Sequence, residues 1–265
     1  MRNWTLLLAL FIGLQLSAQD AEWTSIKDIN PFIGTGGHGH THPSAQAPFG
    51  MIQLGPNTRY DGWDGCSGYH YTDSAMYGFT CTHLSGTGVS DYGDLLILPY
   101  SSPTKEGDHI KFFKEDEHAQ AGYYACILDD GTRIEATAGD RIGKLRLHFP
   151  RNSSPGIMVD LNFRDRVLKQ DFSALGAGKF EGRRISEGWA REQHFYFGFE
   201  VSPAPDSVWK LSPGVYWLSL PEGTVDAEVS IGMSGTSEKG AWTNFFGEEA
   251  FRPFEDVFTE TQEKW

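Results

Sequence analysis

Side chains that can do chemistry are concentrated in one stretch of the chain, residues 31–94. Five of the nine histidines lie in it, with a tryptophan, several tyrosines and aspartates, and many glycines. It has almost no periodic apolar pattern, so we infer that it was not built mainly to fill a core. Glycine lets the backbone approach a ligand closely, while aromatic and charged groups recognise that ligand. The sequence therefore predicts a binding or catalytic loop cluster here, with histidines at His38, His40, His42, His70 and His83.

Three of these histidines, His38, His40 and His42, stand at every second position. On a strand their imidazoles would share one face and could bind a metal. The flanking glycines argue against a regular strand, and no carboxylate or thiolate stands at a fixed ligand spacing. We therefore favour hydrogen bonding within a loop or to a substrate over metal binding, and assign no metal ligand.

A second motif joins Trp63 and Asp64 to Cys66, Tyr69 and His70 through glycines. Rings with polar tips on such a backbone suit stacking against a sugar and hydrogen bonding to its hydroxyls. The alternative is a packed Ω-loop whose rings cover the end of a sheet. Cys66 could be a nucleophile only with a base beside it, and the sequence marks none.

A third motif begins near His83 and ends at Asp91 and Asp94. The two carboxylates could form an acid/base pair, but aspartate beside glycine more often forms a turn. Neither is therefore assigned a catalytic role. The glycines at 34–37 lack the Lys-Ser/Thr ending of a phosphate loop and are followed by prolines, which argues against nucleotide binding.

The net charge and the N-terminal segment further restrict the classes of function that this protein can have. The net charge of −13 opposes binding to nucleic acid or to anionic membrane surfaces and favours a neutral or cationic partner. Residues 1–18 are expected to be a secretory signal, because Arg2 precedes an apolar run and small residues. No later segment predicts a membrane span. We therefore expect a periplasmic or secreted protein, in which three cysteines allow at most one disulfide.

The rest of the chain predicts the scaffold. Nine strand-like runs follow residue 94, and Lys144–Phe149 alternates clearly between apolar and charged residues. Many short strands separated by turn residues favour an antiparallel β-sandwich over 19–240. The runs are Leu95–Pro99, Gly122–Leu128, Arg133–Thr137, Lys144–Phe149, Ile157–Leu161, Phe180–Trp189, His194–Val201, Val215–Leu220 and Val225–Met233.

Residues 241–265 are interpreted as a helical linker. Apolar residues from Phe254 to Trp265 fall on one face at helical spacing, after Pro253. The helix has no stop signal at Trp265, which suggests that more chain follows. We expect it to pack poorly on its own domain.

Four motifs between Asn30 and Pro99 resemble the N-terminal domain of glycoside hydrolase family 92, the calcium-dependent exo-α-mannosidases. They occur in order and read NPFIGT, GHGHTHPSAQAPFGMIQLGP, GWDGCSGYHY and THLSGTGVSDYGDLLILP. The resemblance covers about the whole chain after residue 18 and is most specific in the first third. One departure is His42, where we expect an aromatic residue such as phenylalanine.

The resemblance implies a β-sandwich followed by an (α/α)6 barrel that these 265 residues do not contain. The general acid, the general base and the calcium ligands would belong to that barrel, so no catalytic residue is expected here. The implied mechanism is inverting, with an acid protonating the leaving oxygen and a base activating water. The expected substrate is a mannose-containing glycan, mannan or N-glycan, with α-1,2 linkages preferred. The expected partner is the barrel in cis.

The resemblance also implies substrate contacts in this chain. Trp63 is expected beside the leaving-group sugar and Gly39 in the same pocket, so the sandwich would supply one wall. Weaker candidates for substrate binding are His38, His40, Asp64, Cys66, Tyr69, His70 and His83. The fragment alone is expected to be inactive. The alternative is a stand-alone carbohydrate-binding β-sandwich without hydrolytic activity.

Overall fold

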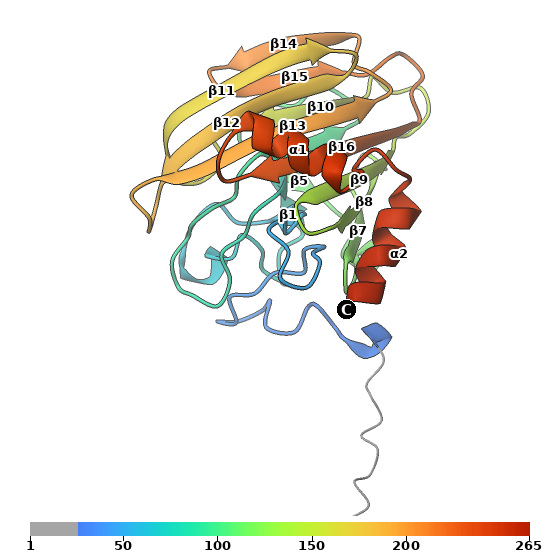
Figure 1. The fold of residues 1–265 in the computed structure, drawn as a ribbon. Helices are drawn as coiled ribbons and strands as arrows, with labels where there is room; N and C mark the ends of the chain where they lie inside the picture. Colours follow the sequence, from blue (N-terminus) through green and yellow to red (C-terminus); the bar gives the residue numbers. More distant parts are fainter. Residues whose placement is uncertain (1–25) are drawn as a thin grey trace, which may run out of the picture.

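A computed structural model describes residues 26–265, so the secretory signal expected at 1–18 lies outside the described residues. Two large sheets stack face to face, and every strand pair in them is antiparallel (Figure 1). A two-stranded sheet, β2 (Ala75–Met76) with β5 (Ile110–Lys111), lies beside them. The antiparallel β-sandwich is thus confirmed.

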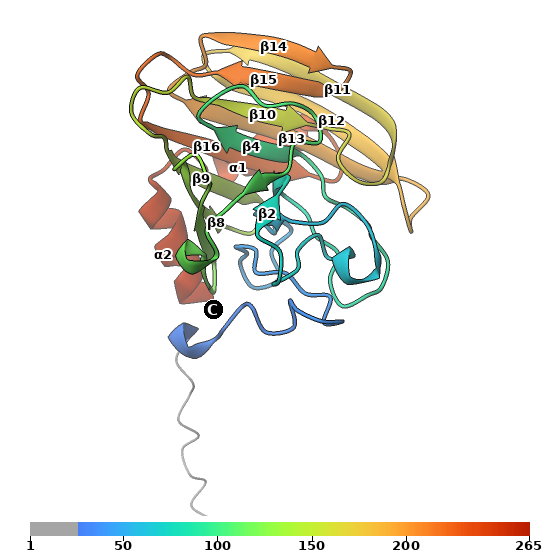
Figure 2. The same cartoon turned by 180° about the vertical axis from the view of Figure 1, so that it is seen from behind.

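The six-stranded sheet faces the viewer in Figure 2. In spatial order its strands are β1 (Gly55–Asn57), β3 (Gly78–Thr80), β4 (Leu96–Tyr100), β10 (Gly156–Asp160), β15 (Val215–Ser219) and β14 (Ser207–Ser212). Its central strand β10 is buried throughout and pairs with β4 on one side and β15 on the other.

The eight-stranded sheet forms the other layer and extends further along the molecule. In spatial order its strands are β11 (Arg166–Gly176), β12 (Lys179–Glu187), β13 (Gln193–Ser202), β16 (Asp226–Ser234), β9 (Ile142–His148), β8 (Arg133–Ala138), β7 (Tyr123–Ile127) and β6 (His118–Gln120). Side chains from both sheets, such as Leu147 and Phe199 from one and Val159 from the other, form one core.

Two helices, α1 (Glu238–Gly247) and α2 (Phe254–Lys264), pack on the eight-stranded sheet (Figure 1). The expectation that the C-terminal helix packs poorly on its own domain was wrong. Phe254 and Val257 are buried, and the Thr261 hydroxyl, also buried, donates to the Ala138 carbonyl at 2.7 Å. Most of the apolar face of α2 is therefore covered by this domain, while Trp265 at its end is exposed.

Lys144 on β9 shows why the helices dock so closely. Alternation predicted a charged outer face for this strand, but the Lys144 side chain is completely buried under the segment between α1 and α2. Its ammonium donates to the carbonyls of Ala250 at 2.9 Å and Arg252 at 2.6 Å, and it pairs with Glu228. A buried ammonium needs such partners, so Lys144 anchors the helical segment to the sheet.

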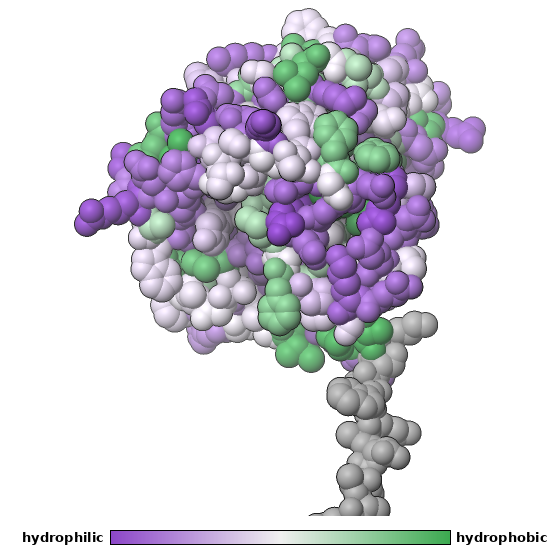
Figure 3. All heavy atoms as spheres, viewed as in Figure 1, coloured by the Kyte–Doolittle hydropathy of each residue, from purple (hydrophilic) through white to green (hydrophobic). Residues whose placement is uncertain are grey.

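Residues 26–95 form mainly loops at one end of the sandwich, at the lower side of Figure 1. Short 3-10 turns are η1 (Ile26–Asp28), η2 (Trp63–Gly65) and, beyond these loops, η3 (Lys114–Asp116). Large apolar side chains from this end, including Ile33, Phe49 and Met51, are exposed. Apolar atoms gather at the lower edge of the face drawn in Figure 3.

In the described part of the chain, no helix has the length and apolar character needed to cross a membrane. Cys66, Cys81 and Cys126 are free and buried. The disulfide that the sequence left open is therefore not formed among them.

Candidate functional site

Trp63 is an exposed aromatic side chain of the loop cluster. It begins η2, directly after Gly62, whose φ of 88° favours glycine. The ring is 62% exposed, yet it is held in place, because a Cβ atom on Gly88 would lie only 2.0 Å from it. The His40 ring meets it edge-on, with centroids 4.9 Å apart. Trp63 therefore presents a positioned, accessible indole.

Two histidines and one carboxylate lie beside this ring. His38 Nδ1 is 2.5 Å from Asp64 Oδ1, and His40 Nε2 is 3.8 Å from the same oxygen. The hydrogen bond with His38 lowers the pKa of Asp64, so this carboxylate is ionised at neutral pH. His40 Nε2 is buried and has no hydrogen-bond partner among the described residues. The group can thus accept and donate hydrogen bonds next to an aromatic surface.

Gly39 lies in the tight loop that joins these two histidines. A Cβ atom there would fall 1.9 Å from the carbonyl oxygen of Gly34, so no other residue fits. The Gly39 amide donates to the Gly36 carbonyl at 3.1 Å, and the next turn is closed by Thr41 donating to Gly34 at 3.2 Å. Gly39 is itself exposed, which leaves its backbone accessible next to His38 and His40.

The remaining candidates lie beneath the surface. Cys66 is buried with its thiol directed at the Thr87 carbonyl, and burial raises its pKa. The hydroxyl of buried Tyr69 donates to Glu117 at 2.8 Å. His70 Nε2 lies 3.2 Å from the Gly37 carbonyl. These three buried side chains therefore stabilise the loop cluster through contacts beneath its surface.

His83 is also buried and stacks on His42, with ring centroids 4.6 Å apart. Burial lowers the pKa of both imidazoles, that of His83 to about 4, so both are neutral at neutral pH. His42 thus occupies, as a stacked ring, the position at which the resemblance led us to expect an aromatic residue.

The three alternating histidines do not converge on a metal. His38 binds Asp64, His40 contacts Trp63 and His42 stacks on His83. Across residues 26–265, no three His, Cys, Asp or Glu side chains come together in a way that could hold a metal ion. The described residues therefore do not fit a calcium ion, and the calcium ligands that the resemblance places in an (α/α)6 barrel stay a prediction.

Two arginines distant in the sequence hold the cluster from below. The Arg164 guanidinium, almost completely buried, donates to the carbonyls of Gly65 at 3.2 Å and Cys66 at 2.9 Å, at the end of η2. Arg184, also buried, donates to the carbonyls of Leu161 at 3.0 Å and Phe163 at 2.9 Å. Neither arginine was predicted from the sequence, because both lie in the scaffold region with no local motif.

Asp91 and Asp94 are not placed to act as an acid/base pair. Asp94 accepts from Arg184 at 2.5 Å and from the Thr82 hydroxyl at 2.7 Å. Asp91 accepts from the Trp189 amide at 3.1 Å. Both carboxylates are buried and committed to these structural hydrogen bonds.

Comparisons with known proteins point to one family of glycosidases. The family model for the glycosyl hydrolase family 92 N-terminal domain matches residues 29–249. A family GH92 α-mannosidase from Bacteroides thetaiotaomicron is 27% identical, with a TM-score of 0.83 over 91% of this chain and 37% of that one. An inverting GH92 mannosidase from the same organism is 21% identical, with a TM-score of 0.79 over 92% of this chain and 36% of that one, and shows the same fold.

A curated protein from Arthroderma benhamiae, described as an uncharacterized secreted glycosidase, is 29% identical over 171 residues, 58% of this chain and 22% of that protein. The chain thus spans well under half the length of these relatives. The family model, however, covers most of the chain and includes the entire loop cluster around Trp63. The chain therefore belongs to glycosyl hydrolase family 92 and carries its N-terminal domain.

Proposed function

We propose that this domain is part of a secreted or periplasmic exo-α-mannosidase and forms one wall of its substrate pocket. The observation that carries the proposal is the exposed Trp63 ring, fixed by Gly88 and His40 in a domain of this family. A flat indole complements the apolar C–H face of a pyranose. The His38–Asp64 pair beside it supplies a hydrogen-bonding edge for sugar hydroxyls.

The chemical step is assigned to a second domain of the same protein. Asp91 and Asp94 are committed to structural hydrogen bonds, and Asp64 is bound to His38, which leaves none of the three poised as general acid or base. An inverting reaction needs two carboxyl groups on opposite sides of the scissile bond, with room for water between them. We propose that an (α/α)6 barrel supplies them, together with the calcium ligands.

The loop end of the sandwich is the proposed docking surface for that barrel. Ile33, Met51 and the fully exposed Phe49 lie there, and patches of apolar side chains on a soluble protein mark interfaces. The substrate would then lie between the barrel and Trp63. We propose α-1,2-linked mannose in mannan or N-glycans as the substrate.

Release of mannose from α-1,2-mannobiose tests this function. The intact protein is expected to release mannose, and residues 19–265 alone are not, because one open wall cannot impose the geometry that chemistry needs. An intact protein that binds mannobiose without hydrolysing it would support the carbohydrate-binding alternative instead. Hydrolysis by residues 19–265 alone would show that the acid and base were wrongly assigned.

A further inference from the structure

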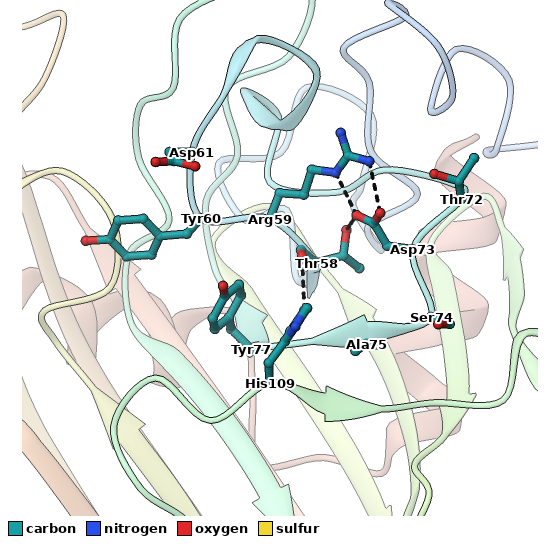
Figure 4. A pocket seen from close by; sticks show the side chains of 10 residues that line it. All are labelled: Thr58, Arg59, Tyr60, Asp61, Thr72, Asp73, Ser74, Ala75, Tyr77 and His109. Carbon is teal, nitrogen blue, oxygen red and sulfur yellow. Dashed lines mark hydrogen bonds and ion pairs between the residues drawn. The ribbon is translucent and has the colours of Figure 1, made fainter.

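A cavity of about 490 Å³ opens beside the loop that carries Trp63, and no role has been given to it (Figure 4). We call it the Tyr60 basin; its residues used below are Thr58, Arg59, Tyr60, Asp73, Tyr77 and His109. Tyr60 and Asp61 lie on one side in Figure 4, and Thr72 and Ser74 on the other. The Arg59–Asp73 pair spans the space between them.

The polar part of the basin is a fork of two parallel hydrogen bonds. Arg59 donates to Asp73 from Nε at 2.9 Å and from Nη2 at 3.0 Å, and the Thr58 hydroxyl donates to Asp73 at 2.8 Å. Burial alone would raise the pKa of Asp73, but these hydrogen bonds lower it. Both partners are therefore charged at neutral pH, and together they are neutral. Such a pair offers donors and acceptors side by side.

Aromatic rings form the opposite wall. Tyr77 and His109 are stacked, with centroids 4.5 Å apart, and Tyr60 meets Tyr77 edge-on at 6.3 Å. Tyr60 is 47% exposed. His109 Nε2 donates to the Thr58 carbonyl at 3.2 Å, so in the neutral imidazole Nδ1 is an acceptor. Apolar ring surface thus faces a fixed set of hydrogen-bonding groups.

We propose that the Tyr60 basin binds one neutral hexose unit of an oligosaccharide, separately from the sugar at Trp63. Adjacent hydroxyls can accept from the guanidinium and donate to the carboxylate at the same time, while the rings cover a C–H face of the sugar. The paired charges disfavour a purely anionic or cationic ligand. The volume lies within the range of small-molecule sites.

The basin is also connected to the Trp63 turn. Tyr60 precedes Trp63 by three residues, and the Arg59 side chain packs under η2, where a Cβ atom on Gly65 would lie 2.7 Å from it. One oligosaccharide longer than a disaccharide is therefore a suitable ligand. The inference rests on the proposed function only for the choice of mannose.

The test is a nuclear magnetic resonance titration of the chain with linear α-1,2-mannotriose, following the ring signals of His109 and Tyr77 and the indole N–H of Trp63. We expect saturable shifts of the basin signals. Tyr60→Ala should weaken this binding about fivefold to tenfold, because this is the contribution to affinity expected from one stacked aromatic ring. Trp63→Ala should leave the basin signals responsive. The matched control is Trp209→Ala on β14, because the Trp209 side chain is as exposed as that of Trp63. This control should not change the binding of the sugar.

Each alternative outcome is distinguishable. Shifts at Trp63 without shifts at His109 and Tyr77 would overturn the basin and leave the proposed function intact. Shifts of the basin signals without a shift of the Trp63 signal would support sugar binding in the basin and count against the proposed function. Equal shifts with inorganic phosphate, or undiminished binding in a folded Tyr60→Ala variant, would show that the basin does not recognise a neutral sugar.

Discussion

Asp165 makes the stability of this domain depend on pH near neutrality. Its carboxyl is half-buried and lies among Arg184, Asp91 and Arg164. Burial raises its pKa to about 7; Arg184 opposes this rise, and Asp91 adds to it. The folded domain therefore holds a proton on Asp165 at pH values where the unfolded chain has released it.

The magnitude follows from that difference. A pKa raised from 3.8 to about 7 corresponds to about 4 kcal/mol at 1.36 kcal/mol per unit. Because the carboxyl is only half-buried, solvent screening reduces the expected effect to about 1–2 kcal/mol. This destabilisation is absent below the unfolded pKa, grows as pH rises between the unfolded and the folded pKa, and is complete above the folded pKa.

The substitution Asp165→Asn should remove this pH-dependent destabilisation. Asparagine is neutral, and it tolerates the positive φ of 51° found at this residue. We expect the free energy of unfolding to rise by about 1–2 kcal/mol at pH 8 and to be unchanged at pH 4. Urea unfolding of wild type and variant across this range measures it, with exposed Asp206→Asn as the control. A variant effect that is independent of pH, or destabilising at pH 8, would show that the pKa of Asp165 is not raised in the folded domain.

Three further predictions concern packing, thiols and metal. Phe254→Ala should lower the free energy of unfolding by about 3 kcal/mol, because the ring is buried against the sheet; a loss below about 1 kcal/mol in urea unfolding would contradict the docking of α2. Cys66, Cys81 and Cys126 should react with an aromatic disulfide reagent only in denaturant, because burial raises the pKa of each thiol; rapid labelling of the folded chain would disagree. Millimolar calcium should not raise the Tm of residues 19–265, since no oxygen cage lies among the described residues; a rise seen with calcium and not magnesium would disprove this.

The sequence predicted the central strands well and the edges poorly. Strands such as β9, β10 and β16 bury whole faces, so their apolar runs are visible in the sequence. The edge strands β11 and β14 were missed because they are mostly exposed and read as mixed polar segments. The docking of α2 was missed because Lys144, a charged residue, anchors the segment before it through contacts more than 100 residues apart in the chain.

The loop cluster was predicted from residue types, but its division into surface and support was not. Trp63, His38 and Gly39 are accessible, whereas Tyr69 and Cys66 are buried. Local spacing carries no information about which side of a loop meets the core. Arg164 lies almost one hundred residues from the carbonyls it binds, so only the folded sheet brings it to η2.

The role of Trp63 is tested most directly by kcat/KM of the intact protein and its Trp63→Ala variant on α-1,2-mannobiose and on an activated aryl α-mannoside. We predict a loss of about tenfold on the disaccharide, because its leaving sugar needs the indole for positioning, and a much smaller loss on the aryl substrate, whose leaving group departs readily. Equal losses on both substrates, or no loss on the disaccharide, would show that Trp63 is a packing residue and that this loop does not contact the substrate.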